Sequence, residues 1–506
     1  MSDIVRERWN SSRSFTLAAV GSAVGLGNMW RFPYLAYKYG GGAFLFPYII
    51  ALFVLGIPLL ILELALGQKL QKGAIKAFKA IHPRLVGIGF LGIATSFIIV
   101  IYYATVMAWT AFYLVQSFSQ NLPWADNPKG YFFQNVLNIS ESIAEMGTVN
   151  WHLLLALACV WVATYFCIRK GVQSVGSIVS ITVFLPIILL IILLVIFFFR
   201  GITLDGAWTG IYYYACPDFS ALLSAEVWIA AASQIFFTFS ISMGVMIAYA
   251  SFNKPTNNIL KNALVIALFD AAISIFSGFI VFSVIGHMAY ETGQPVLDVA
   301  TSGPGLTFVV FPKLLALMPW WTGFFSVLFF LVLLTLGIDS VFSLVESIVV
   351  VISDNLSEIR KEQISYWVCA LCFSLSFFFT TDAGLYYLDL IDHYVTNFLL
   401  VFVGILECIA IGWIFGVERV RQYINSLSSY KVHKRWNIVV KLVIPLVLGT
   451  LLFLYVGEEL DLPYGGYPNW AVKIAYSIVG FPVFIAVAMT LRPQKKITVD
   501  DEYSLR

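Results

Sequence analysis

Long uninterrupted hydrophobic runs divide the chain into about twelve segments, each with the roughly 20 apolar residues that a helix needs to cross a bilayer. The segments start near residues 12, 42, 88, 151, 175, 226, 258, 320, 363, 387, 436 and 469. Apolar residues are continuous within each run and do not alternate with polar ones, which excludes the strands of a membrane β-barrel. The pattern therefore predicts an all-α integral membrane protein in which residues 1–506 form one polytopic membrane domain.

The first segment, from about Phe15 to Tyr37, is interrupted by the run Gly21-Ser22-Ala23-Val24-Gly25-Leu26-Gly27-Asn28. Each glycine weakens a helix by roughly 1 kcal/mol relative to alanine, so the helix is expected to break here. An unwound backbone is tolerated in a membrane only where it faces protein or a water-filled cavity. Its freed carbonyl and N–H groups can then hold ions. The alternative is that these glycines only allow close helix packing, but Asn28 and Arg31 would then have no evident role.

The sixth segment has a similar interruption, because Gln234 through Gly244 place Thr, two Ser and Gly inside an apolar run. Two interrupted segments in corresponding positions are the best sequence indication of an inverted-repeat transporter. A spacing of five spans inverts the second copy in the membrane. We therefore expect a 5+5 repeat with its site near the bilayer midplane, with repeat one at about 12–199, repeat two at about 226–415 and two accessory helices at about 436–491.

Composition supports the membrane assignment, since 60% of residues are hydrophobic, 11% are charged and the mean hydropathy is +0.87. Soluble proteins carry about 25% charged residues. Lys and Arg gather at the N-terminus, in the 69–84 loop and in the 416–435 loop. The positive-inside rule then predicts a multi-pass protein of the plasma (inner) membrane with both termini cytoplasmic. The loops at 120–150 and 287–319 become external, and residues 301–305 are expected to form a lid.

Other classes of protein find little support in the sequence. A net charge of +2 gives no indication of nucleic-acid binding, and the six cysteines lie mostly within hydrophobic runs, where they are typical of buried side chains and not of a disulfide framework. The five histidines are scattered, and neither a His pair for a metal nor a Ser/His constellation is present. The sequence therefore does not indicate an enzyme.

Several separated motifs together resemble the neurotransmitter:sodium symporter family, whose members have the LeuT-type fold. The resemblance covers roughly Arg6 to Gly416 and rests on Ala23-Val24-Gly25-Leu26-Gly27-Asn28, Trp30-Arg31-Phe32-Pro33, Gly40-Gly41-Gly42-Ala43-Phe44, Pro47-Tyr48, Glu63 ahead of Leu66-Gly67-Gln68, Tyr102-Tyr103, Gln234 through Gly244, Gly303-Pro304-Gly305-Leu306 and Thr335-Leu336-Gly337-Ile338-Asp339-Ser340. The short termini, and the lack of a Cys pair in the 120–150 loop, are typical of prokaryotic members.

The resemblance implies two sodium sites. The residues that match the first site are Ala23, Asn28, Thr238 and Asp270, and those that match the second are Gly21, Val24, Leu336, Asp339 and Ser340. The family usually has Asn where this chain has Asp270. Its chloride-dependent members add an anion site, whose matching positions here are Tyr48, Gln234, Thr238 and Ser274. A carboxylate at Asp270 would repel a chloride ion about 4–6 Å away, so chloride independence is favoured, while a protonated or sodium-shielded Asp270 would leave chloride binding open.

The resemblance also implies the substrate class. Members that carry amines without a carboxylate have Asp at the position of Gly25, so glycine there indicates α-amino acids. The matching substrate-binding positions are Ala23, Gly25, Leu26, Gly27, Ile99, Tyr103, Val106, Phe237, Thr238, Ser240, Ser242, Met243, Ser340 and Leu344. Met243, an adaptable side chain in place of a frequent Phe, favours a bulky side chain on the substrate, whereas Ser242 in place of a frequent Gly narrows the same wall.

Two ion pairs match the gates of the family, Arg31 with Asp392 on the outside and Arg6 with Asp354 on the inside, where Trp9 would pack the N-terminal segment down. Exposed ion pairs contribute only about 0–1 kcal/mol, which suits contacts that open in each cycle. We expect a sodium-coupled symporter that imports a neutral, hydrophobic or aromatic L-amino acid by alternating access. The alternatives are symport of an osmolyte or GABA-like amino acid, and an amino-acid-gated channel or receptor on the same fold. The oligomeric state is left open.

Overall fold

The computed structural model describes residues 8–169, 184–216, 219–299, 305–356, 358–462 and 464–492. These residues form helices and loops, and a single isolated bridge between Val149 and Thr381 is the only β-pairing among them. Ten helical stretches are long and apolar enough to cross a membrane, and the two broken segments cross in addition. The predicted all-α membrane protein of about twelve spans is confirmed. Arg6, residues 301–304 of the expected lid and the predicted start of a span near 175 lie outside the described residues.

The first segment breaks at the glycine-rich run. Helix α1 (Ser12–Ala23) ends where Val24 and Gly25 turn to extended backbone, with Gly25 at φ −152° and ψ −154°. The short α2 (Leu26–Met29) follows, and α3 (Arg31–Lys38) continues outward. The predicted interruption is therefore present, and it lies at the middle of the three glycines.

The sixth segment breaks as well. Helix α13 (Ala225–Thr238) stops before Phe239, and α14 (Val245–Ala250) begins after Gly244. Between them, Ser240, Ser242 and Gly244 have positive φ angles of 52°, 61° and 69°. Glycine takes up this backbone conformation without cost, but the two serines do so against the preference of residues with a Cβ. The surrounding packing must therefore hold them in place.

The remaining crossings are continuous or contain only a wide π-helical turn. In the first half they are α4 (Gly42–Ala51) with α5 (Ile57–Leu70) across the turn Leu52–Gly56, then α7 (Val86–Gln116), α9 (Trp151–Ile168) and α11 (Phe184–Ile202). In the second half they are α15 (Ile259–Thr292), α18 (Thr322–Asn355), α19 (Lys361–Ser376), and α20 (Gly384–Tyr394) with α21 (Val401–Ile409) across the turn Val395–Leu400. The accessory pair comprises α23 (Arg435–Ile438) with α24 (Ile444–Asp461) across the turn Val439–Val443, and α25 (Asn469–Leu491).

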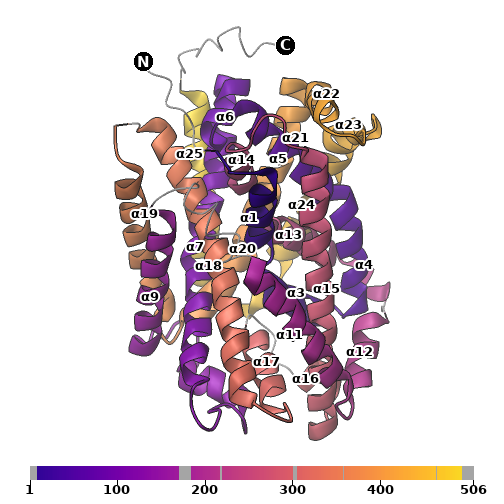
Figure 1. Ribbon diagram of the computed structural model, residues 1–506, viewed down its shortest axis with the longest axis vertical. Helices are drawn as coiled ribbons and strands as arrows, with labels where there is room; N and C mark the ends of the chain where they lie inside the picture. Colours follow the sequence, from indigo (N-terminus) through magenta and orange to yellow (C-terminus); the bar gives the residue numbers. More distant parts are fainter. Residues whose placement is uncertain are drawn as a thin grey trace.

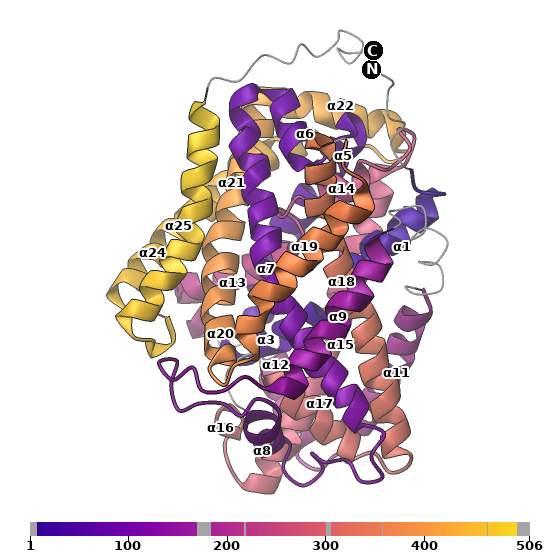
Figure 2. The ribbon, with the colours of Figure 1, turned by 90° about the vertical axis from the view of Figure 1, so that its left-hand side faces the viewer.

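Short helices cover the two ends of the bundle (Figures 1 and 2). One end carries α6 (Ala74–Ile81) and α22 (Val417–Leu427), which belong to the basic loops, with the connecting turns Pro83–Leu85 and Ala410–Gly416. We call it the inner end. The opposite, outer end carries α8 (Pro128–Gly130), α12 (Ala207–Ala215), α16 (Val296–Val299) and α17 (Leu306–Ala316), with the turns Tyr131–Val136, Phe219–Leu223, Phe377–Thr380 and Tyr464–Gly466. The predicted alternation of basic and non-basic loops thus corresponds to two opposite ends of the molecule.

The broken segments lie at the centre of the bundle. All residues of α2 and α14 are buried, and so are those of α13 apart from Glu226 and Trp228. The residues of both breaks are buried as well. Helix α7 packs along α18, and α1 packs against both α15 and α18. In contrast, α25 shows exposed apolar side chains along most of its length, as expected for a helix at the lipid-facing edge of the bundle. The unwound backbone therefore faces protein on all sides.

Candidate functional site

A small closed cavity of about 20 Å³ lies between the two breaks. It is lined by Ser22, Ala23, Gly25, Gly27, Ile99, Tyr103, Phe237, Thr238, Ser240, Met243, Ser340 and Leu344. All of these except Ser22 were predicted from the sequence. Three predicted residues, Leu26, Val106 and Ser242, are buried nearby but do not line it. A cavity of this size holds about one water molecule, so the walls are closed in this conformation.

Polar groups gather at the end of the cavity near Gly25. A Cβ atom at this glycine would lie 2.5 Å from the Ser340 hydroxyl oxygen and 3.2 Å from that of Tyr103. The Tyr103 hydroxyl also interacts with Ser340 and with the backbone of Leu26. Hydroxyl and backbone N–H donors that converge on one point can bind a carboxylate. The absence of a side chain at Gly25 is what leaves that point open.

The opposite end of the cavity is apolar. Ile99 and Leu344 lie on the unbroken helices α7 and α18, Phe237 lies near the end of α13, and Met243 lies within the second break. The rings of Tyr103 and Phe237, which both line the cavity, have centroids 6.4 Å apart. The site can therefore hold a molecule with one anionic end and one apolar end.

The predicted first sodium position brings together oxygen atoms from three segments. The Thr238 hydroxyl donates to Asp270 Oδ1 at 2.8 Å and lies 3.5 Å from the carbonyl oxygen of Ala23. The side-chain nitrogen of Asn28 sits among them, 2.7 Å from Asp270 Oδ1, while its oxygen accepts a hydrogen bond from the Gly25 N–H. The NH₂ group of an amide carries partial positive charge. The oxygen atoms of Ala23, Thr238 and Asp270, which we call the oxygen cradle, thus already lie around the partial positive charge of the Asn28 NH₂ group. A sodium ion ligated by the Asn28 oxygen would require this amide to turn.

The predicted second position lies between α1 and α18. The Ser340 hydroxyl is 3.3 Å from the carbonyl oxygen of Ser22 and 3.4 Å from that of Leu336, two acceptors on different helices. Within the part of the chain that the structure describes, the buried Oδ2 atom of Asp339 has no hydrogen-bond partner. An unpaired carboxylate oxygen in a membrane is costly, and a bound cation would offset that cost. The carbonyl positions Gly21 and Val24 lie at the adjoining C-terminal end of α1.

The predicted anion positions also lie together, next to Asp270. Tyr48 is fully buried and faces both Asp270 and Ser274. The Oε1 atom of Gln234 accepts a hydrogen bond from Arg31 at 2.7 Å, whereas its buried Nε2 atom has no partner among the described residues. The hydroxyl groups of Tyr48 and Ser274 thus lie in the same region as the Asp270 carboxylate.

The ion pair predicted for the outer gate is present. Arg31 Nε lies 3.2 Å from Asp392 Oδ2, with both side chains largely buried. The sequence did not indicate three further contacts of this pair. Tyr102 donates to Asp392 Oδ1 at 2.7 Å, and Arg31 donates to Thr396 at 2.8 Å and to Gln234 at 2.7 Å. Thr396 follows Asp392 by four residues, one helical turn. This spacing could have indicated from the sequence that Thr396 lies on the same helix face as Asp392.

The inner gate is described in part, because Arg6 lies outside the described residues. Its expected partner, Asp354, accepts a hydrogen bond from the Gly73 N–H at 2.8 Å, and its backbone carbonyl accepts one from the Lys76 ammonium group. Trp9 packs the N-terminal segment down as predicted, since it is 2% exposed and donates to the carbonyl oxygen of Tyr249 at 2.9 Å. The segment at the inner end that carries Gly73 and Lys76 therefore contacts Asp354, which the sequence had not indicated.

Comparison with known proteins decides the family. The model of the sodium:neurotransmitter symporter family matches residues 6–130 and 125–495, which is nearly the whole chain. The chain belongs to the sodium:neurotransmitter symporter family. Family members are sodium-coupled transporters, so this symporter is a sodium-dependent transporter and not an enzyme.

Individual relatives of the symporter agree with this assignment. It is 39% identical over 500 residues to an uncharacterized sodium-dependent transporter of Methanocaldococcus jannaschii, covering 98% of this chain and 99% of the relative. It is 36% identical over 518 residues to the sodium- and chloride-dependent taurine transporter of Homo sapiens, covering 94% and 82%. Among solved structures it is similar to MhsT in complex with L-phenylalanine, with a TM-score of 0.77, 26% identity, and coverage of 89% and 99%. The predicted LeuT-type fold is confirmed by this match.

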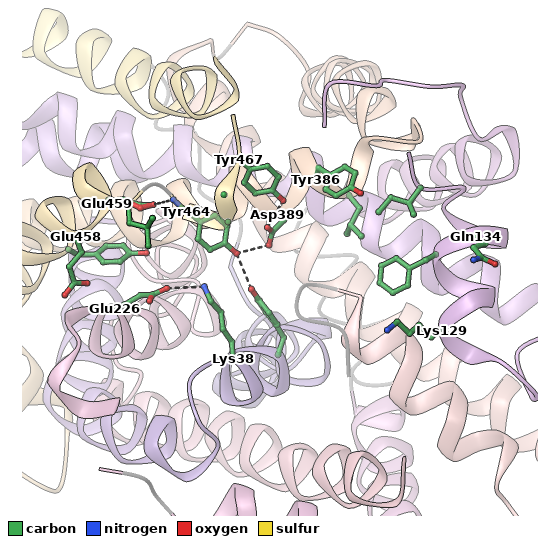
Figure 3. Close-up of a pocket in the computed structure, with 18 of the residues that line it drawn as sticks. Lys38, Lys129, Gln134, Glu226, Tyr386, Asp389, Glu458, Glu459, Tyr464 and Tyr467 are labelled. Carbon is green, nitrogen blue, oxygen red and sulfur yellow. Dashed lines mark hydrogen bonds and ion pairs between the residues drawn. The ribbon is translucent and has the colours of Figure 1, made fainter. Parts of the chain in front are cut away.

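A larger cavity of about 1270 Å³ lies on the outer side of the Arg31–Asp392 pair in the symporter (Figure 3). Its lining combines acidic residues with tyrosines and two lysines, namely Tyr34, Lys38, Lys129, Glu226, Tyr386, Asp389, Tyr455, Glu458, Glu459, Asp461, Tyr464 and Tyr467 among others. The small central cavity and this wide outer vestibule are separate cavities that share no lining residue among those that the structure describes.

Proposed function

We propose that the protein is a sodium-coupled symporter that imports a neutral L-α-amino acid across the plasma membrane by alternating access, with both termini in the cytoplasm. The observation that carries this proposal is Gly25. Its missing side chain leaves open the point on which the hydroxyl groups of Tyr103 and Ser340 converge, next to the oxygen cradle of Ala23, Thr238 and Asp270. A substrate carboxylate bound at that point would contact the first sodium ion. Each would then raise the affinity of the other, as linkage requires.

The apolar end of the cavity supports a hydrophobic or aromatic side chain on the substrate. Ile99, Phe237, Met243 and Leu344 offer no charged group to a substrate. Methionine is unbranched and adapts its shape, so Met243 can move to admit a larger side chain. The relative MhsT was crystallised with L-phenylalanine, which agrees with this choice.

A second candidate is a small osmolyte-like amino acid. It is supported by the cavity volume of about 20 Å³ and by the names of two relatives, a taurine transporter and a glycine transporter. Such a substrate would need less movement of Met243 and Phe237 than a hydrophobic or aromatic amino acid would. An amino-acid-gated channel or receptor remains the alternative of a different class.

Uptake into proteoliposomes tests the proposal. With an inward sodium gradient, radiolabelled leucine or phenylalanine should accumulate above its external concentration, and replacing external sodium by choline should abolish this. Unlabelled leucine, tryptophan, glycine, taurine and GABA are then compared as competitors, and glycine or taurine as the strongest competitor would favour the second candidate. Accumulation without sodium would contradict coupling, and equilibration without accumulation would indicate the channel.

We further propose two sodium sites and chloride-independent transport. Asp270 supports this, because its carboxylate lies beside Tyr48 and Ser274, where an anion would otherwise be expected. A fixed carboxylate then balances the charge of the cations, and a chloride ion at the same place would be repelled.

A further inference from the structure

The loop that links α24 to α25 reaches into the outer vestibule (Figure 3). Gly465 and Gly466 both have φ +66°, a conformation that suits glycine, and they reverse the chain direction between the two helices. This turn places Tyr464 and Tyr467, on either side of the glycines, inside the vestibule. The two accessory helices thus contribute side chains to the outer path, although the family motifs of the sequence end before them.

One set of contacts joins the loop to α20, the helix that carries the gate residue Asp392. The hydroxyl groups of Tyr464 and Tyr467 donate to the two oxygens of Asp389, at 3.0 Å and 2.9 Å. The Tyr464 ring stacks on the imidazole ring of His393, with centroids 3.5 Å apart and planes 12° apart. The loop is therefore attached to α20 through both the hydroxyl group and the ring of Tyr464.

The base of the loop is fixed to the same helix. Glu459 of α24 lies 3.2 Å from His393 Nε2 and accepts a hydrogen bond from the backbone N–H of Tyr464 at 3.0 Å. Tyr455 also contacts His393 Nε2, at 3.1 Å. Because Glu459 and His393 are both buried, these contacts are shielded from water and from salt. Tyr464 is thus expected to stay with α20 and α24 when other helices move.

A second set of contacts joins Tyr464 to α3, the outer half of the broken first segment. The hydroxyl groups of Tyr464 and Tyr34 lie 3.2 Å apart, and the Lys38 ammonium nitrogen lies 4.5 Å from the centre of the Tyr464 ring. Lys38 also pairs with Glu226 of α13 at 3.1 Å, which ties together the outer halves of the two broken segments. Tyr464 therefore connects α20 to α3 and, through Lys38, to α13, which are the outer halves expected to move in alternating access.

The positions of these partners relate the bridge to the outer gate. Tyr34 follows Arg31 by three residues on α3, and Asp389 precedes Asp392 by three residues on α20. Residues three apart lie on the same face of a helix, one turn from each other. The Tyr34–Tyr464–Asp389 bridge is thus a second connection between the same two helices, one turn further out than Arg31–Asp392.

We propose that Tyr464 is a positioning residue of the outer gate, which holds α3 against α20 and so limits how often the Arg31–Asp392 pair opens. The proposal rests on the alternating-access function proposed above. It assigns a task to the accessory helices, which is to carry the loop that closes the vestibule. Opening the outer path then requires Tyr34 and Lys38 to leave Tyr464, while the contacts of Tyr464 with Asp389 and His393 remain.

Cysteine accessibility tests this without any substrate. In full-length protein with all six native cysteines replaced by serine, two reporters are used separately, Ile99→Cys in the central cavity and Ala19→Cys in the inner half of α1. The rate at which a small charged methanethiosulfonate reagent modifies each reporter is measured in sodium-free buffer. Protein with Tyr464 unchanged is compared with the Tyr464→Phe and Tyr464→Ala variants. Tyr430→Phe serves as the matched control, since this tyrosine is 83% exposed in the inner loop after α22.

We expect Tyr464→Phe to raise the modification rate at Ile99→Cys by about three- to tenfold, the range that follows from losing one or two hydrogen bonds. Tyr464→Ala should raise it further, and the rate at Ala19→Cys should stay the same or fall. An unchanged rate at Ile99→Cys would overturn the proposal, and so would a rise at both reporters, because general loosening of the fold would expose both. Asp389→Asn provides a second variant if Tyr464→Ala does not fold, with the same expected direction. Failure of sodium-driven uptake would count against the proposed function and would leave this comparison intact.

Discussion

Gly25 has both a structural role in the backbone and a proposed role in substrate selection. It is the point where α1 gives way to α2, and its missing Cβ leaves room for the hydroxyl groups of Ser340 and Tyr103. A contact of 2.5 Å is far shorter than carbon and oxygen atoms tolerate without movement, so any side chain here displaces Ser340. Ser340 in turn joins α18 to α1 at the predicted second sodium position.

Gly25→Ala should therefore weaken amino-acid binding by about tenfold or more, equivalent to about 1.4 kcal/mol. Gly480→Ala is the matched control, because a Cβ at this glycine of α25 meets no atom within 4 Å. Affinity can be measured by thermal shift in sodium over a series of concentrations of the transported amino acid. Equal affinities of the Gly25→Ala variant and the unmodified protein would contradict the assigned carboxylate position.

Asp270 is the residue that sets this chain apart from the usual family pattern. Its carboxylate accepts hydrogen bonds from Thr238 and Asn28 and lies next to Tyr48 and Ser274. One acidic side chain thus belongs to the predicted cation position and lies beside the predicted anion position. We propose that the charge of this carboxylate decides which ions the site can bind at the same time.

Asp270→Asn removes that charge while keeping the shape of the side chain. We expect uptake by the unmodified protein to be equal in chloride and in gluconate, and uptake by the variant to fall severalfold in gluconate and to recover in chloride. Ser277→Ala, one turn beyond Ser274 on the same helix, is a control for a change in polarity that leaves the charge intact. Chloride-dependent uptake by the unmodified protein would show that Asp270 does not replace the anion.

At the scale of elements, a proline in the broken first segment leaves a backbone carbonyl free, and a residue of an outer helix binds that carbonyl. Pro33 has no N–H to donate to the carbonyl of Met29, four residues earlier. The hydroxyl group of Thr307, on α17, donates to this carbonyl at 2.6 Å. Tyr37 of α3 donates to the carbonyl of Leu297 at 2.5 Å. The outer half of the broken segment is thus hydrogen-bonded to both α17 and α16.

Thr307→Val should break the first of these links and leave the Met29 carbonyl unsatisfied. We expect stability to fall by about 1–3 kcal/mol, the cost of a buried polar group without a partner, whereas Thr307→Ser should retain most of it. Thermal unfolding in sodium, followed by size-exclusion chromatography, measures the difference. Equal loss in the two variants would point to the methyl group and not to the hydrogen bond.

At the scale of the whole molecule, the two ends differ in charge and in the loops that cover them. The basic loops with α6 and α22 lie at one end, and α16 and α17 lie at the other (Figure 2). Lys and Arg near membrane-spanning helices favour the cytoplasmic side, so the inner end is expected to face the cytoplasm.

A single cysteine at Tyr430 should accordingly react with an impermeant maleimide only after the cells are opened, and one at Leu462 should react in intact cells. Both side chains are more than 80% exposed, at 83% and 81%, so access is not limited by burial. The exposed native cysteines at 159, 167 and 216 are first replaced by serine. Labelling of the Tyr430 position in intact cells would reverse the assigned orientation.

Much of the fold and of the central site could be predicted from local features. Continuous apolar runs indicate the spans, and glycines and small polar residues indicate the two breaks, because helix propensity and membrane burial act over a few neighbouring residues. The family resemblance then supplied positions such as Tyr103 and Phe237, and the structure brings these together around one cavity. Leu26, Val106 and Ser242 do not line that cavity, since a motif gives the position of a residue and not the direction of its side chain.

The sequence by itself determined the membrane class, the twelve-segment organisation of roughly 20-residue spans and the two interruptions. The family resemblance added the pairing of Arg31 with Asp392. Only the tertiary structure decided which distant groups meet, such as Thr396 with Arg31 or Tyr464 with Tyr34, 430 residues apart. The reason is physical: a helix or its break depends on neighbours along the chain, whereas a hydrogen bond between side chains depends on how whole helices pack. That packing places one loop of the accessory helices at the outer gate.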